Sequence, residues 1–85
     1  MKAISVLLNT IDKVRTFVTA VSPFSGELDL KSGRYTVDAK SIMGIFSLDL
    51  SRPMDLLIHE NAENPDLDKA IQPFLAPMKD VSDKD

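Results

Sequence analysis

Few side chains in this sequence could do chemistry. His59 is the only histidine among the 85 residues, and cysteine is absent. A metal ion in a protein needs several ligands close together, which one histidine without cysteine does not supply. His59 falls on the outward side of a predicted strand, so we interpret it as a solvated strand residue. The sequence therefore predicts no metal site and no cofactor.

Acidic residues gather around the start of the last predicted helix. They are Glu60, Glu63, Asp66 and Asp68. Paired carboxylates can act as general acid and base or hold a cation, but no nucleophile or ligand pattern accompanies these. Negative charge at a helix start complements the helix dipole instead. The three glycines show no spacing that cradles a phosphate. We therefore expect that the chain is not an enzyme.

Composition and charge exclude several classes of function. The formal net charge is −3 with scattered lysines and arginines, whereas nucleic-acid binding needs a concentrated positive field. No apolar run approaches the roughly 20 residues that span a membrane. The absence of cysteine favours the cytoplasm over a secreted, disulfide-bonded protein. We expect one domain over residues 1–79 and a disordered tail at 80–85, with no nucleic-acid partner and no membrane contact.

The elements that must position any site begin with four segments of alternating apolar side chains. These predicted strands lie at residues 2–8, 27–31, 34–39 and 54–60. Ser32-Gly33 predicts a hairpin turn between the second and the third, because glycine adopts a positive φ without strain. The side chains expected to face the core are Ile4, Val6, Leu8, Leu28, Leu30, Tyr35, Val37, Ala39, Leu56 and Ile58. The four strands would form one antiparallel sheet.

Helix signals alternate with these strands. Apolar spacing and capping side chains predict helices at residues 11–22, at 41–48, and from Pro65 onward. The expected caps are Asn9 or Thr10, then Ser41, then Asn64. The apolar positions are Ile11, Val14, Phe17, Val18 and Val21 in the first helix, and Leu67, Ala70, Ile71, Phe74, Leu75 and Met78 in the last. Pro23 ends the first helix, and Pro73 and Pro77 predict a kink or an early end in the last. The order β-α-β-β-α-β-α predicts an α+β fold with helices on one face of the sheet.

One segment carries a specific resemblance. The run KSIMG at residues 40–44, followed by IFSL at 45–48, resembles the regulatory-site segment of HPr, the small phosphocarrier of the bacterial sugar phosphotransferase system. The likeness extends over roughly residues 24–75. It implies a two-layer open-faced sandwich whose four-stranded antiparallel sheet has the order 1-4-2-3.

The same resemblance assigns a role to Ser41. It implies that an HPr kinase phosphorylates this serine, and a phosphate there would meet the free amides of a helix start. Lys40, the preceding residue, would add electrostatic attraction. From the residues alone, Ser41 is a helix N-cap that contributes about 1 kcal/mol. The two interpretations are compatible.

The apolar residues after Ser41 indicate a binding surface. A helix of two turns cannot bury Ile42, Met43 and Phe46 on one side, so we expect part of this cluster to be exposed. Exposed methionine and phenylalanine are typical of binding hot spots. In the family this surface, with Lys40, docks partner proteins.

The amino-terminal third departs from the family. HPr carries its phosphoryl group on a histidine that caps the first helix, followed closely by an arginine and a proline. A gapless alignment places Thr10, Asp12 and Lys13 at these three positions, and the alternative is a loop about three residues shorter. Neither alignment supplies a histidine. A threonine ester would not be readily passed on, and Asp12 would repel a phosphoryl group.

These observations predict a regulatory or binding relative of HPr that is not a histidine phosphocarrier. Its expected partners are phosphotransferase-system enzymes, an HPr kinase or a transcriptional regulator. One alternative is a phosphocarrier with a displaced acceptor, for which His59 is the only histidine. Another is a structural or oligomerisation domain unrelated to sugar uptake, and fold alone does not decide among the three.

Overall fold

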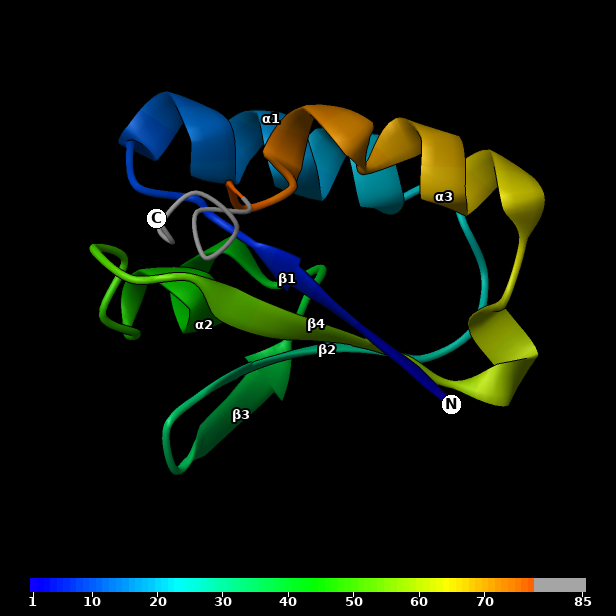
Figure 1. Ribbon diagram of the computed structural model, residues 1–85, viewed down its shortest axis with the longest axis horizontal. Coiled ribbons are helices and arrows are strands. Elements are labelled where there is room, and N and C mark those ends of the chain that lie inside the picture. The colour runs from blue at the N-terminus through cyan, green and yellow to red at the C-terminus, as the bar shows by residue number, and fades with distance from the viewer. Residues whose placement is uncertain (78–85) are drawn as a thin grey trace, which may run out of the picture.

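Four strands and three helices make up the described part of the chain. The computed structural model describes residues 1–77 (Figure 1). Its elements are β1 (Lys2–Val6), α1 (Ile11–Val21), β2 (Leu28–Ser32), β3 (Tyr35–Asp38), α2 (Ile42–Phe46), β4 (Met54–Ile58) and α3 (Pro65–Ala70), with 3₁₀ turns at Glu60–Ala62 and Gln72–Phe74. The element order agrees with the one expected from the sequence.

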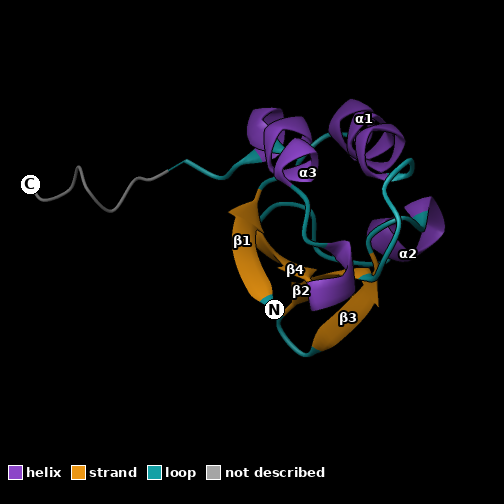
Figure 2. Cartoon of the chain, turned by 90° about the vertical axis from the view of Figure 1, so that its right-hand side faces the viewer, coloured by secondary structure: helices purple, strands orange, loops and turns teal. Residues whose placement is uncertain are grey.

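The sheet has the strand order β1-β4-β2-β3, and every neighbouring pair is antiparallel. The helices lie on one side of it, with α1 next to α3 and α2 beside β3 (Figure 2). The predicted α+β open-faced sandwich and its 1-4-2-3 order are therefore confirmed. Because successive side chains of a strand point to opposite faces, one face of the sheet packs on the helices and the other stays open.

The hairpin follows the predicted alternation except at its tip. Leu28 and Leu30 are buried, and Gly33 takes φ +61° in the turn. Tyr35 was expected to face the core, but 70% of it is exposed. It begins β3 next to the turn, and Figure 1 shows this end of the hairpin directed away from the helices. The alternation along a strand predicts the face of the sheet on which a side chain lies. That side chain is buried only where the helices cover this face.

The core lies between the sheet and the helices. α1 buries Val14, Phe17 and Val21, and the ring of Phe17 meets that of Phe74 edge-on at 5.4 Å. Ile11, also expected on the buried stripe, is 62% exposed. It is the first residue of α1, so the helix reaches the core only one turn later. The apolar stripe predicts the buried face but not where the core ends.

Two predicted strands end two residues early in the structure. β1 ends at Val6 rather than at residue 8, although Leu8 is fully buried. β4 ends at Ile58 rather than at residue 60, because the chain enters a 3₁₀ turn at Glu60–Ala62. This turn places the Asn61 side chain, whose Oδ1 accepts from the Glu27 backbone N–H at 3.0 Å.

The last helix begins as predicted and ends early. Asn64 Oδ1 accepts from the Asp66 N–H at 2.8 Å, and Pro65 occupies the first helical position. The 3₁₀ turn with Pro73 then replaces the α-helix, which agrees with the early end expected from a proline. Leu75, assigned to the helical stripe, instead forms a bridge with Val6 and is 39% exposed. Met78 and the expected tail at 80–85 lie outside the described residues.

Candidate functional site

Ser41 stands where β3 gives way to α2. Its extended backbone (φ −100°, ψ 106°) places the hydroxyl Oγ as acceptor of the Gly44 N–H at 3.1 Å. Its own N–H donates to the Asp38 carbonyl at 3.0 Å, which fixes the bend after β3. The residue is half-buried. Ser41 is therefore the helix N-cap that the sequence predicted, and its hydroxyl is held by one amide.

Gly44 allows this serine and α2 to approach β3 closely. A methyl group at Gly44 would lie 3.2 Å from Ser41 Oγ and 3.2 Å from Val37 Cβ. These separations are shorter than ordinary van der Waals contact. A glycine at this position therefore gives the cap its tight packing.

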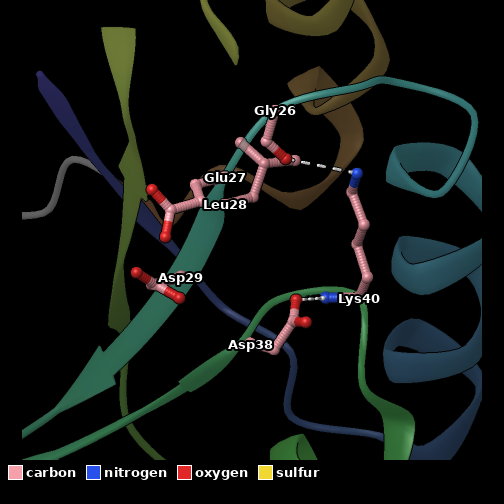
Figure 3. Close-up of a pocket in the computed structure, with 6 residues that line it drawn as sticks. All are labelled: Gly26, Glu27, Leu28, Asp29, Asp38 and Lys40. Carbon is pink, nitrogen blue, oxygen red and sulfur yellow. Dashed lines mark hydrogen bonds between the residues drawn. The ribbon is translucent and has the colours of Figure 1, made fainter. Parts of the chain in front are cut away.

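The ammonium of Lys40 binds a loop that the sequence did not predict as its partner. Its ammonium donates to the carbonyl of Phe24. It also donates, at 3.4 Å, to the carbonyl of Gly26, as Figure 3 shows. Its backbone N–H donates to Asp38 Oδ1 at 2.8 Å. The ammonium thus ties the loop after α1 to the end of β3, and its attraction to a phosphate on Ser41 stays a prediction. Adjacency in sequence carried no information about this long-range partner.

Three apolar side chains of α2, which we call the α2 patch, differ in exposure. Met43 is 76% exposed and Phe46 is 39% exposed, whereas Ile42 is half-buried against the core. Ile45 is fully buried and anchors the helix. A helix of five residues has only one inward face, so the expected partial exposure of this cluster is observed. The arrangement places an apolar surface within two turns of Ser41.

Thr10 caps α1 in the same way that Ser41 caps α2. Its side chain accepts from the Lys13 N–H at 3.1 Å, so Thr10, not Asn9, is the cap. Its neighbours Ile11 and Asp12 are exposed, and Asp12 places a carboxylate in the first turn. The hydroxyl oxygen of Thr10 is the nucleophile that this cap offers, and the carboxylate of Asp12 lies in the same helical turn.

His59 has a partner, contrary to its prediction as a solvated strand residue. Its Nε2 lies 2.9 Å from Asp29 Oδ2, and the two side chains are 31% and 30% exposed. It follows the end of β4, and its N–H donates to the Glu27 carbonyl at 3.2 Å. The outward alternation of β2, combined with the 1-4-2-3 order, is the signal that could have placed Asp29 beside it.

A shallow pocket of about 210 Å³ lies at the start of β2 (Figure 3). It is lined by Gly26, Glu27, Leu28, Asp29, Asp38 and Lys40. Asp29 and Asp38 are register partners on β2 and β3. Within residues 1–77, no three acidic, histidine or cysteine side chains are placed to hold a metal ion. The pocket's one cation, Lys40, is already bound to the loop carbonyls.

Comparisons with known proteins connect this site to a family. A family model described as the PTS HPr component phosphorylation site matches residues 13–79. A solved structure, HPr-C-His from Thermoanaerobacter tengcongensis, is 30% identical, with a TM-score of 0.63 over 85% of this chain and 84% of that chain. A search of curated proteins found no match. The family match includes Ser41 and begins three residues after Thr10. None of the helices within residues 1–77 has the length and apolar character needed to cross a membrane.

Proposed function

Because this chain belongs to the HPr family of the phosphotransferase system, we propose that it is a regulatory binding protein of that system. In this proposal Ser41 phosphorylation controls docking, and the chain does not carry phosphoryl groups on histidine. One observation carries the proposal. A serine that caps α2 adjoins the α2 patch. The gapless alignment places Thr10, the cap of α1, at the family's histidine position.

The setting of Ser41 suits a phosphoacceptor. The hydroxyl is on a half-buried residue at a helix start, and its oxygen is bonded to only the Gly44 N–H among the described residues. A kinase would transfer the γ-phosphoryl group of ATP to Oγ, with the hydroxyl proton removed and ADP released. The phosphate oxygens are strong acceptors, so they can take over the Gly44 N–H. Modification would then add charge without removing the cap.

The α2 patch supports the docking part of the proposal. Met43 and Phe46 offer apolar surface that burial in an interface would remove from water. A phosphate of charge about −1.5 to −2 within two helical turns changes the electrostatics of that surface. Partners that bury the patch beside a neutral serine would differ from those that meet a phosphoserine. The proposed partners are phosphotransferase-system enzymes, an HPr kinase or a transcriptional regulator.

The region around Thr10 argues against histidine phosphocarrier activity. A carrier needs an imidazole nitrogen that forms a labile phosphoramidate, whereas threonine forms a stable ester. Asp12 adds repulsion to an incoming phosphoryl group. The only histidine, His59, is paired with Asp29 next to a pocket lined by further carboxylates. A displaced acceptor at His59 would therefore work against negative charge.

The test uses two phosphorylation systems on the intact chain. One reaction contains ATP and a bifunctional HPr kinase, and the other contains phosphoenolpyruvate and enzyme I. We expect a single acid-stable phosphate on Ser41 from the kinase, which Ser41→Ala removes, and none from enzyme I. Intact mass and fragment mapping measure both. An acid-labile phosphate on His59 would contradict the proposal.

Docking is tested separately by calorimetry with the same enzymes. Met43→Ser and Phe46→Ser should weaken binding by at least about tenfold, which corresponds to loss of a hot-spot contact. Tyr35→Ser is the matched control, because Tyr35 is exposed but lies outside the α2 patch. Light scattering distinguishes the remaining alternative. A stable oligomer that these substitutions dissociate would indicate an oligomerisation domain instead.

A further inference from the structure

The Lys40 ammonium binds the loop that follows α1. The last turn of α1 contains no basic residue, although cations there stabilise the carbonyl end of a helix. The loop that follows turns back on this end, since the Phe24 N–H donates to the Val21 carbonyl at 3.1 Å. The Lys40 ammonium reaches this loop from the end of β3 and bonds to the carbonyls of Phe24 and Gly26. It therefore holds the loop from a residue next to Ser41.

The loop has a second anchor at its other end. The side chain of Asn61 accepts from the Glu27 N–H, and the Glu27 carbonyl accepts from the His59 N–H. Gly26 packs so closely on Asn61 that an added methyl group would lie 2.5 Å from the Asn61 carbonyl oxygen. The 3₁₀ turn thus fixes Gly26 and Glu27, while the Lys40 ammonium is bound nearer to Phe24. Loss of that ammonium would free the part of the loop close to α1.

We propose that Lys40 is a latch that couples phosphorylation of Ser41 to the loop at residues 22–27. The inference rests on the proposed function, since it concerns the phosphorylated form of Ser41. In the unmodified protein the ammonium binds the loop carbonyls. In the phosphorylated protein it binds the phosphate on the adjacent residue, and the loop carbonyls lose their partner.

The charges decide the direction of this exchange. The present bonds join the ammonium to neutral carbonyl oxygens, whereas a bond to a phosphate of charge about −1.5 to −2 would add the attraction between two opposite ions. Glu27, Asp29 and Asp38 line the same pocket as Lys40 and favour its present position. Each of these carboxylates carries at most one charge, and Asp29 is already paired with His59. The phosphate therefore competes successfully for the ammonium.

Release of the loop would change a second surface. Phe24 is half-buried and packs against the core from within this loop. When the carbonyl of Phe24 loses the ammonium, this ring and the end of α1 become less tightly held. Phosphorylation of Ser41 would then act beyond the α2 patch, at the C-terminal end of α1.

The test uses the full chain with phosphoserine incorporated at position 41 during synthesis, so that no kinase is needed. Backbone amide exchange is followed residue by residue by NMR. We expect the Phe24 amide to exchange at least about tenfold faster in the phosphoprotein, as local opening predicts. Lys40→Met should give the same increase without phosphate, and phosphoserine should then add nothing. Lys40→Arg should restore the response, and Lys31→Met, which removes an exposed lysine of β2, should have no effect.

Two results would overturn the latch. One is a phosphoprotein in which the Phe24 amide exchanges as slowly as in the unmodified chain. The other is a phosphate effect of equal size in the Lys40→Met variant, because the lysine would then not carry the coupling. Failure of the proposed function would appear in the kinase and calorimetry experiments, as absent modification or absent docking. Neither outcome affects the exchange measurement, because its phosphoserine is built into the chain.

Discussion

Two helices of this protein begin on a hydroxyl side chain, and the two starts differ in almost everything else. Thr10 caps α1 and Ser41 caps α2, each by accepting a backbone N–H at 3.1 Å. Thr10 is exposed and is followed by the carboxylate of Asp12. Ser41 is half-buried, next to the latched Lys40 and the α2 patch. The fold requires only the cap, so the neighbours of each hydroxyl decide whether the cap can also be a site.

The two helices also depend on their surroundings to different degrees. α1 has 11 residues and buries three apolar side chains, so its packing holds it in place. α2 has five residues, too few for stable helix in isolation, and buries only Ile45. It relies on the Ser41 cap and on the space left by Gly44. Because α2 is short and buries one side chain, a charged group added at its start acts on an element with little packing to hold it.

The largest effect is expected from an attempt to convert the first helix start into a phosphocarrier site. Thr10→His alone should accept little phosphate from enzyme I, because Asp12 repels it. The double variant Thr10→His, Asp12→Arg should gain at least about tenfold in phosphorylation rate by replacing that repulsion with attraction. Acid-labile phosphate measures both. Equal labelling of the single and double variants would show that the missing histidine alone, and not Asp12, prevents phosphorylation at the start of α1.

A second test concerns the loop at residues 22–27, which Lys40 connects to the start of α2 but which, within residues 1–77, has no counterpart at the start of α1. Gly26→Ala should lower the free energy of unfolding by about 2–5 kcal/mol, since φ is +97° and the new methyl group would meet the backbone of Asn61 and Ala62. Gly33→Ala is the matched control. Its φ is +61°, but nothing lies within 4 Å, so only about 1–2 kcal/mol of backbone strain is expected. Urea denaturation compares them, and equal losses would refute the close approach at Gly26.

A third test asks whether the two caps are equivalent for stability. Ser41→Ala and Thr10→Ala each remove one hydrogen bond to a helix amide, so each should destabilise the protein by about 1 kcal/mol. Only Ser41→Ala should also remove kinase modification. Thermal and urea unfolding measure the first effect. A loss at Ser41 well above that at Thr10 would show that this hydroxyl has a structural role beyond capping.

The smallest effect is expected at a third hydroxyl, which donates rather than accepts. Ser51 donates from its side chain at 2.6 Å and from its backbone at 3.1 Å to Asp49 Oδ1, and these bonds lower the pKa of Asp49 below its ordinary value of 3.8. Ser51→Ala should raise this pKa toward 3.8, as an NMR titration of the carboxyl carbon would measure. The lowered pKa stabilises the fold above pH 3.8, and this contribution is lost as the pH falls through the folded value. An unchanged pKa would assign the shift to other groups.

Much of the fold was predictable from the sequence because its signals are local. Caps, prolines and apolar spacing act within a few residues, which is why Ser41, Asn64 and the early end at Pro73 were placed correctly. Long-range partners were not predictable in this way. The bonds from Lys40 to the loop and from His59 to Asp29 join residues 14 to 30 positions apart. Exposure of Tyr35 and Ile11 was also missed, since it depends on where the covering layer stops.

The exposed tyrosine has a consequence for how unfolding can be observed. Tyr35 is the only tyrosine, and the chain has no tryptophan. Since Tyr35 is already 70% exposed in the native fold, unfolding changes its surroundings little and its fluorescence reports poorly on the transition. The buried aromatic rings are instead Phe17 and Phe74, which form an edge-on pair. Phenylalanine absorbs weakly, so these rings add little optical signal. Intrinsic fluorescence therefore changes little when the protein unfolds. Circular dichroism of the backbone is the optical measurement that follows its folding.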